Sequence, residues 1–107
     1  MSKIELLGEK IRRLRLLDNL PLRIVAANLD IDPSILSKIE RGERNINEDM
    51  LILLSNYFKL DLSQLKQEYF GEEIAKTIYK QNNCSKIFKV AEQKIKYLKS
   101  KSNKIDE

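Results

Sequence analysis

The apolar residues of this chain recur every three or four positions, which is the period of an amphipathic α-helix. Only three glycines and two prolines interrupt the pattern. At 107 residues the chain has room for one domain and a short appendage. The sequence therefore predicts an all-α protein with a small core.

Five helices are expected in the first part of the chain, over residues 4–18, 21–29, 33–41, 48–58 and 62–70. The second and third are short, and about three residues join them, which is helix-turn-helix spacing. Asp32 is a suitable N-cap for the third helix, with Pro33 as its first residue and Gly42 as its terminator. Asn47 and Asp61 are expected to cap the fourth and fifth helices.

The apolar pattern thins beyond Gly71, where we expect the chain to break or bend. A short helix is predicted around residues 74–79 and a lysine-rich helix over about 85–100. The expected organisation is a domain over residues 1–70, a helical appendage over 71–100 that could dimerise, and a frayed tail over 101–107.

The residue types argue against catalytic and metal chemistry. The chain has no His, so a His-based triad, general base or metal site cannot form. The one cysteine, Cys84, is interpreted as a structural or incidental thiol. No enzyme activity, metal, cofactor or small-molecule ligand is therefore expected. The apolar runs are far shorter than the ~20 residues that span a bilayer, and no signal-peptide pattern is evident, so we expect a cytoplasmic protein without a membrane partner.

Four consecutive segments carry a resemblance to a known family: LGEKIRRLR, NLPLRIVAANLDID, PSILSKIERGERN and NEDMLILLSNYFKLDLSQL. From Leu6 to about Lys66 the chain resembles the five-helix, lambda-repressor-type helix-turn-helix domain of the xenobiotic-response-element family. The resemblance implies a sequence-specific regulator of transcription, such as a repressor, that occupies an operator. The LPLRIVAANLDID segment further resembles small regulators found beside DNA-methyltransferase or restriction genes.

The third predicted helix would be the recognition helix of such a domain. Ser34, Ser37 and Lys38 share one helical face, opposite an expected core face of Ile35 or Leu36 together with Ile39. Short polar side chains and a lysine near the start of a helix suit contact with base edges in the major groove of double-stranded DNA. We therefore predict these three as base-contacting residues; the alternative is that they are ordinary exposed helix residues.

Phosphate contacts are predicted at and just beyond the end of this helix. Arg41, Arg44 and Asn45 are placed to grip the DNA backbone, or else they form a solvated charged loop. Weaker candidates lie on the first two helices: Arg23, Lys10 and Arg12.

The resemblance also implies a partly buried ion pair between Arg15 and Glu40, which would orient the recognition helix. Two departures from the family pattern lower the expected affinity for DNA. Pro21-Leu22 stands where a Ser-Gln or Thr-Gln pair usually opens the second helix, and Asp30 replaces the usual glycine of the turn.

A homodimer is expected, because proteins of this class read two related half-sites. One candidate surface is formed by the fourth and fifth helices, with Leu53, Tyr57 and Tyr69. The other is the appendage, with Ile74, Ile78, Ile87, Phe88, Ala91, Ile95 and Leu98.

A second class of function is a protein-interaction module on the same fold, such as an antitoxin or adaptor. An unusually apolar set of residues on the first two helices favours it: Leu16, Leu17, Leu22 and Ile24. The alternative for this set is local packing between the two helices.

The net charge of +4 is unevenly distributed. Residues 1–45 have 9 cationic and 7 anionic side chains, residues 46–79 have 3 and 6, and residues 80–107 have 8 and 3. Most of the basic excess therefore lies in the last helix, where the lysines either contact flanking phosphates or form the solvated face of a dimer helix.

Overall fold

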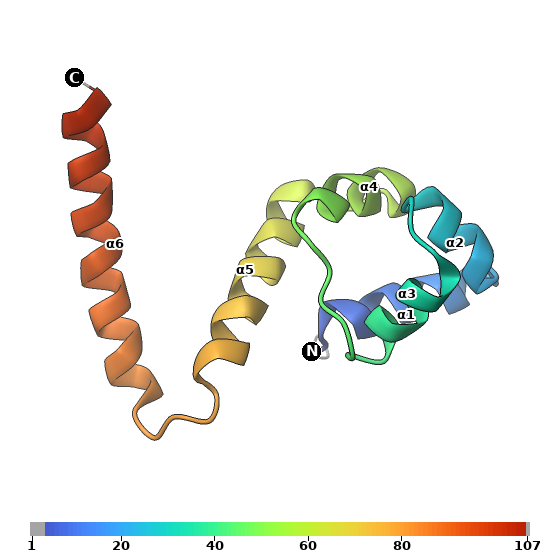
Figure 1. The fold of residues 1–107 in the computed structure, drawn as a ribbon, viewed down its shortest axis with the longest axis horizontal. Helices are drawn as coiled ribbons and strands as arrows, with labels where there is room; N and C mark the ends of the chain where they lie inside the picture. Colours follow the sequence, from blue (N-terminus) through green and yellow to red (C-terminus); the bar gives the residue numbers. More distant parts are fainter. Residues whose placement is uncertain (1–3, 107) are drawn as a thin grey trace. The chain divides into compact units, whose positions relative to one another are not determined.

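The structure is a computed structural model that describes residues 4–106, with side chains described for residues 4–102. These residues form helices, turns and loops and contain no strand, which confirms the all-α prediction. The helices, shown in Figure 1, are α1 (Leu7–Leu17), α2 (Leu22–Asn28), α3 (Pro33–Glu40), α4 (Asp49–Phe58), α5 (Leu62–Ile78) and α6 (Cys84–Asp106).

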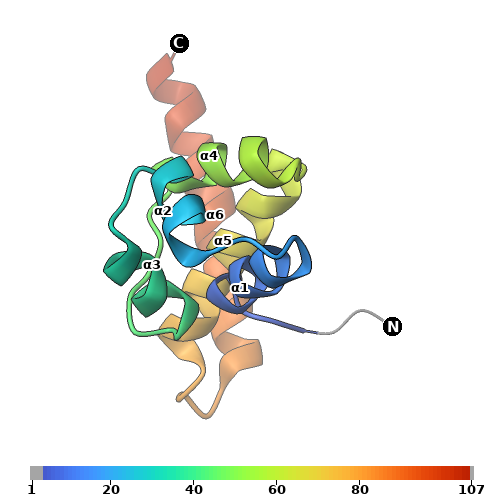
Figure 2. The same ribbon diagram turned by 90° about the vertical axis from the view of Figure 1, so that its right-hand side faces the viewer.

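The chain divides between Ile74 and Ala75 into two compact units, which we call the N-terminal unit and the C-terminal unit. In the N-terminal unit, α3 packs against both α1 and α2 (Figure 2). The apolar side chains that form its core come from α1 to α5 and from the α2–α3 and α3–α4 connections: Leu7, Ile11, Val25, Ala26, Leu29, Leu36, Ile39, Ile46, Met50, Leu51, Leu54 and Leu65. This single core fixes α3 relative to its neighbours.

Left-handed residues follow the first four helices and allow the chain to turn sharply. Asn19, Asp30 and Gly42 have φ angles of 52°, 57° and 76° after α1, α2 and α3. Lys59 has a φ of 55° after α4, although lysine is not a residue type that favours this conformation. Asp30 thus adopts the conformation for which the family pattern more often has glycine.

The helix starts follow the predicted caps with small differences. Oδ1 of Asn47 accepts a hydrogen bond from the Met50 amide at 3.0 Å, and Oδ1 of Asp61 accepts one from Ser63 at 3.0 Å. Asp32 is the N-cap of α3, but its side chain makes no capping hydrogen bond. Pro21 is the N-cap of α2 rather than its first helical residue.

The expected break at Gly71 is wrong, because α5 continues through it to Ile78. Contacts with α1 extend along this helix: Oε2 of Glu68 lies 2.9 Å from Nζ of Lys10, and Oε1 of Glu72 accepts a hydrogen bond from the Leu7 amide at 2.8 Å. These contacts hold α5 beside α1 on both sides of Gly71, and their favourable energy offsets the cost of a mid-helix glycine.

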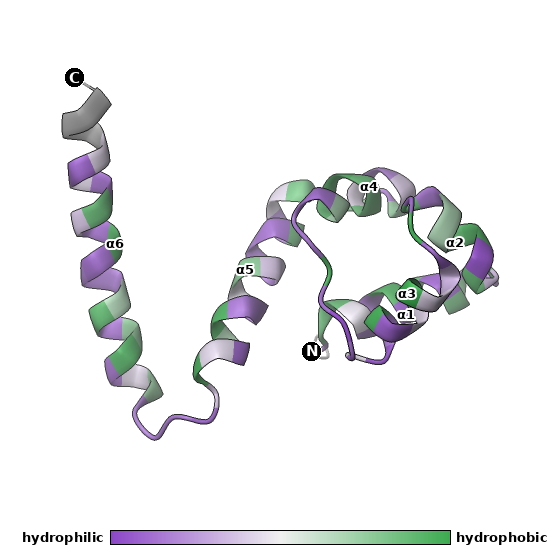
Figure 3. Ribbon diagram, viewed as in Figure 1, coloured by the Kyte–Doolittle hydropathy of each residue, from purple (hydrophilic) through white to green (hydrophobic). Residues whose placement is uncertain are grey.

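The C-terminal unit contains the last turn of α5, a loop and α6. Sγ of Cys84, the first residue of α6, lies 3.3 Å from the Ile78 carbonyl oxygen and 3.4 Å from that of Gln81, so the thiol helps to close the loop. Within residues 75–102 no side chain is fully buried, and Figure 3 shows apolar and polar residues interspersed along α6. The helix extends to Asp106, within the segment expected to be a frayed tail, and Glu107 lies outside the described residues.

Candidate nucleic-acid interface

Helix α3 has one buried face and one exposed face. Leu36 and Ile39 are buried in the core of the N-terminal unit. Ser34 and Lys38 are exposed and Ser37 is half-buried, and their spacing places all three on the face away from those core residues. A helix held by its core side and open on the other is the arrangement required for insertion into a DNA groove.

Arg41 follows α3, and its side chain points back toward the helix. Its Nη1 donates a hydrogen bond to Oγ of Ser37, and its Nε lies 2.6 Å from Oε2 of Glu43. The predicted base-contact and phosphate-contact residues are therefore linked directly, and Glu43 competes with phosphate for the Arg41 guanidinium. Arg44 and Asn45 are exposed in the connection that leads to α4.

The weaker phosphate candidates differ in their surroundings. Arg23 on α2 and Arg12 on α1 are exposed. Lys10 forms the ion pair with Glu68 described above, and 19% of its side chain is exposed. The Lys10 ammonium is therefore engaged by α5 rather than presented to a ligand.

Arg15 of α1 and Glu40 of α3 are brought together in a bidentate ion pair. Nε of Arg15 lies 2.8 Å from Oε2 of Glu40, and its Nη2 lies 2.8 Å from Oε1. Nη1 of Arg15 also donates to the Leu20 carbonyl oxygen at 3.1 Å. Only 13% of the Arg15 side chain and 4% of the Glu40 side chain are exposed. The pair thus joins the end of α3 to α1 and to the start of the α1–α2 connection.

The hydrogen bonds from Arg15 to Glu40 raise the pKa of Arg15, and the Coulomb attraction of Glu40 acts in the same direction against the effect of burial. A raised pKa for a cation means that its stabilising contribution is complete below the ordinary arginine value and is lost only above it. The Arg15 guanidinium therefore stays charged throughout the neutral range.

Sequence reasoning missed a second contact between α1 and α3. A Cβ atom built on Gly8 would overlap the carbonyl oxygen of Ile39. Only glycine lets the backbones of α1 and α3 approach this closely. The available signal was spacing, since Gly8 precedes Arg15 by two helical turns and lies on the same face of α1.

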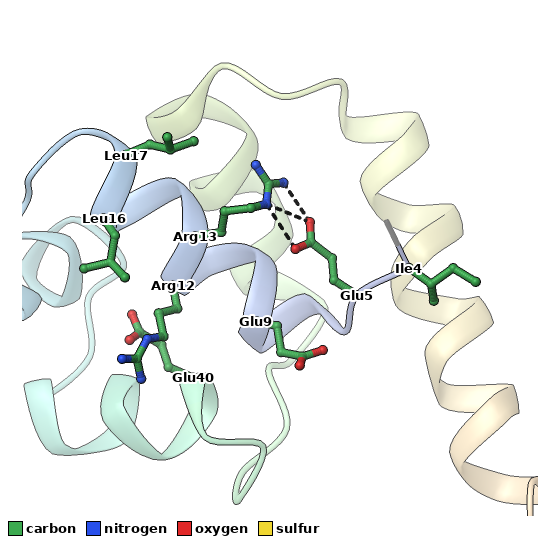
Figure 4. A pocket seen from close by; sticks show the side chains of 8 residues that line it. All are labelled: Ile4, Glu5, Glu9, Arg12, Arg13, Leu16, Leu17 and Glu40. Atoms are coloured by element: carbon green, nitrogen blue, oxygen red, sulfur yellow. Dashed lines mark hydrogen bonds and ion pairs between the residues drawn. The ribbon is translucent and has the colours of Figure 1, made fainter. Parts of the chain in front are cut away.

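The apolar set on the first two helices separates into two parts. Leu22 packs against the core and Ile24 is half-buried, which fits local packing. Leu16 and Leu17 are 52% and 68% exposed and, with Ile4, line a hollow of about 650 Å³ on the outer side of α1 (Figure 4). These two leucines are the part of the set that local packing does not explain.

Neither a metal site nor a membrane-spanning helix is found in the described part of the chain. Among these residues no group of three or more Cys, Asp or Glu side chains could hold a metal ion. None of the described helices is long and apolar enough to cross a bilayer.

The fold and the exposed face of α3 define a class: small all-α domains that present a helix-turn-helix. A family model described as helix-turn-helix matches residues 11–65, just over half of the chain, and the chain belongs to this lambda-repressor-like family. The protein is accordingly a DNA-binding regulator of transcription. No curated protein and no solved structure matches the chain.

Proposed function

We propose that the protein regulates transcription, as a repressor, by occupying an operator as a homodimer with α3 in the major groove of each half-site. In this proposal Ser34, Ser37 and Lys38 contact base edges. Lys38 supplies the strongest discrimination, because a lysine donates to O6 and N7 of guanine, whereas serine distinguishes bases poorly. The protein needs no cofactor for this activity.

The proposal rests mainly on the difference in burial between the two faces of α3. Its core residue Leu36 is 0% exposed, whereas Lys38 is exposed two residues further on. The ion pair of Glu40 with Arg15 then fixes the end of α3 on α1. A helix that is rigidly held and open on one side can position its side chains against bases without a large loss of entropy on binding.

The phosphate contacts in the proposal come from residues that follow α3. Arg41, Arg44 and Asn45 would set the register of α3 on the duplex, with Arg23 of α2 as a further contact. To contact a DNA phosphate, Arg41 has to break its ion pair with Glu43. Glu43→Gln should therefore tighten binding to any duplex several-fold.

Dimerisation is part of the proposal, since one α3 with two serines and a lysine specifies few base pairs. The surface on α4 includes Leu53, which is 38% exposed, and its neighbour Ile52, which is 53% exposed. The surface on α6 includes Phe88, Ile95 and Leu98, which are 51%, 50% and 61% exposed. The larger set of unburied apolar side chains on α6 favours the second surface, on which Ile87 and Ala91 also lie.

The test is selection of bound duplexes from a random library at about 150 mM salt. The expected result is an inverted repeat with half-site centres one helical turn, ~34 Å, apart. Promoters of restriction and methyltransferase genes should be included, because the second-helix segment resembles regulators of such loci. The absence of any enriched sequence would overturn the operator proposal.

Two lysine variants then identify the groove-facing helix. Lys38→Gln should cost about 1–3 kcal/mol on the selected duplex and much less on a duplex of arbitrary sequence. Lys66→Gln, an equal change of charge at an exposed position of α5, is the matched control. Equal losses for the two variants would mean that Lys38 acts only through its charge.

A second candidate function is a protein-interaction module of the antitoxin or adaptor type. The exposed Leu16 and Leu17 beside the hollow on α1 favour it, because large unburied apolar side chains often mark a protein contact. A Leu16→Ser, Leu17→Ser variant tests this candidate. It should leave DNA binding and stability unchanged and abolish co-purification of a partner from cell extract if the candidate is correct, and unchanged co-purification would reject it.

A further inference from the structure

Helix α6 carries a second, purely polar face on the side opposite its apolar stripe. The stripe contains Ile87, Phe88, Ala91, Ile95 and Leu98. The opposite face recurs at intervals of three and four residues over almost four turns and contains Lys86, Lys89, Gln93, Lys96 and Ser100. Every one of these five side chains is a hydrogen-bond donor, and none is a carboxylate. We refer to this set as the donor face.

The lysines of the donor face are unneutralised within the described part of the chain. Lys86, Lys89 and Lys96 are exposed, and none of them has a hydrogen bond or ion pair with another described residue. Between residues 84 and 102 the sequence has one carboxylate, Glu92, which lies one helical turn before Lys96 at the edge of the donor face but forms no ion pair with it. The face therefore presents three lysines, none of which is paired with a carboxylate of the described residues.

An ordinary solvated helix face mixes both signs of charge, because like charges one turn apart destabilise a helix and opposite charges stabilise it. Two cations of α1 do have partners: Lys10 pairs with Glu68 of α5, and Arg13 pairs with Glu5, which precedes α1. The donor face has no such mixture over eleven residues, from Lys86 to Lys96. A face of this kind is electrostatically complementary to an extended anionic surface.

We propose that the donor face of α6 binds phosphates of the DNA backbone outside the base pairs that α3 reads. Lysine, glutamine and serine are among the side chains that contact phosphate oxygens in protein–DNA complexes. Lys86 and Lys96 are separated by about 15 Å along the helix axis, which is close to half a turn of B-DNA. The inference rests on the proposed operator binding and adds a set of contacts that is independent of base sequence.

The position of the donor face favours DNA over an anionic membrane. A helix that lies on a bilayer inserts its apolar side, so the lysines that help it are those that flank the stripe. On α6 those are Lys94, Lys99 and Lys101, whereas the donor face would point into water. With DNA on the donor face, the apolar stripe remains available to a second copy of the chain.

The test compares two triple variants of the full-length protein that remove the same charge. Lys86→Gln, Lys89→Gln, Lys96→Gln neutralises the donor face, and Lys94→Gln, Lys99→Gln, Lys101→Gln neutralises the flanks of the stripe. Affinity for a 40-base-pair duplex is measured by fluorescence anisotropy at several salt concentrations, on the selected sequence and on an arbitrary one. Circular dichroism and sedimentation velocity establish that both variants remain helical and keep the wild-type oligomeric state.

The expected result is a decrease of about five in the magnitude of the slope of log K against log salt for the donor-face variant, because a dimer loses six lysines at about 0.9 per lost phosphate contact. The decrease should be the same on both duplexes, and the flank variant should change the slope by less than one. Equal changes for the two variants, or none for the donor-face variant, overturn the inference. The inference is also overturned if the donor-face lysines make the protein bind vesicles of equimolar phosphatidylserine and phosphatidylcholine more tightly than the duplex.

These outcomes are distinct from a failure of the operator proposal. If selection enriches no sequence, operator recognition fails, but the slopes on the arbitrary duplex still test the donor face. If an inverted repeat is enriched and the donor-face slope is unchanged, α3 reads the operator and α6 does not contact DNA.

Discussion

The two units of this protein use amphipathic helices in opposite ways. In the N-terminal unit, apolar side chains from five helices meet in one core, and every buried side chain among the described residues lies between Leu7 and Leu65. In the C-terminal unit, α6 is longer than any of those helices, yet none of its side chains described is buried. The same helical period therefore produces a closed domain in one unit and an open surface in the other.

This difference indicates which unit supplies stability and which one supplies contacts. A helix in water gains most of its stability from packing of its apolar face. The N-terminal unit satisfies this requirement internally, whereas the stripe on α6 requires a second surface to cover it. We therefore expect substitutions in the N-terminal unit to change unfolding, and substitutions on α6 to change association.

The largest expected effect is a direct test of this contrast with one substitution in each unit. Leu51→Ala removes a side chain that is 0% exposed and should lower the free energy of unfolding by about 2–5 kcal/mol. Leu98→Ala changes a side chain that is 61% exposed and should leave the urea midpoint unchanged while weakening the dimer. Urea titration followed by circular dichroism and sedimentation equilibrium measure the two quantities. A similar loss of stability in both variants would show that the units share a core.

The next effect concerns the link between α1 and α3. Arg15→Ala leaves the Glu40 carboxylate, 4% exposed, without its ionic partner and should cost about 3 kcal/mol, the lower end of the range for buried pairs. DNA affinity should fall together with the melting temperature, because α3 loses its anchor. Arg13→Ala removes the more exposed pair with Glu5 and should change neither quantity. Unchanged melting of the Arg15→Ala protein would mean that the pair does not hold α3.

A smaller effect is expected where the two helix backbones touch. Gly8→Ala would place a methyl group against the Ile39 carbonyl oxygen, so α1 and α3 have to separate. The expected loss is about 1–3 kcal/mol, typical of an overpacked contact, with a parallel loss of DNA affinity. Thermal melting and anisotropy measure the two effects. Wild-type melting would mean that the helices adjust without cost.

Much of the N-terminal unit could be predicted from local rules. Asn19, Asp30 and Gly42 mark the ends of three helices because few residue types adopt positive φ readily. The exposed face of α3 follows from its period. The Arg41–Glu43 contact could not be predicted, because it depends on the rotamer of one side chain. The spacing of Gly8 from Arg15 places Gly8 on the face toward α3, but it does not give the distance between the two backbones.

The boundary between the units was the least predictable feature. A glycine after an amphipathic segment is usually a helix terminator, and local rules therefore favoured a break at Gly71. What keeps α5 continuous is tertiary, since Glu72 reaches the amide of Leu7, sixty-five residues earlier in the chain. Such a contact leaves no local signal. Glu72 also shows that the N-terminal unit uses residues beyond the limit of 70 expected from the sequence.

The smallest expected effect tests this boundary with Gly71→Ala. A Cβ atom at residue 71 would meet nothing within 4 Å. Gly71 also does not have a positive φ angle, unlike Gly42, so its backbone suits alanine. Alanine should therefore stabilise a continuous α5 by about 0.5–1 kcal/mol, the usual gain over glycine inside a helix. Urea unfolding measures the gain, and Gly42→Ala is the control that should instead destabilise, since its φ of 76° is strained for alanine. A loss of stability in Gly71→Ala would place a bend at residue 71 and return the boundary to the end of the fifth predicted helix.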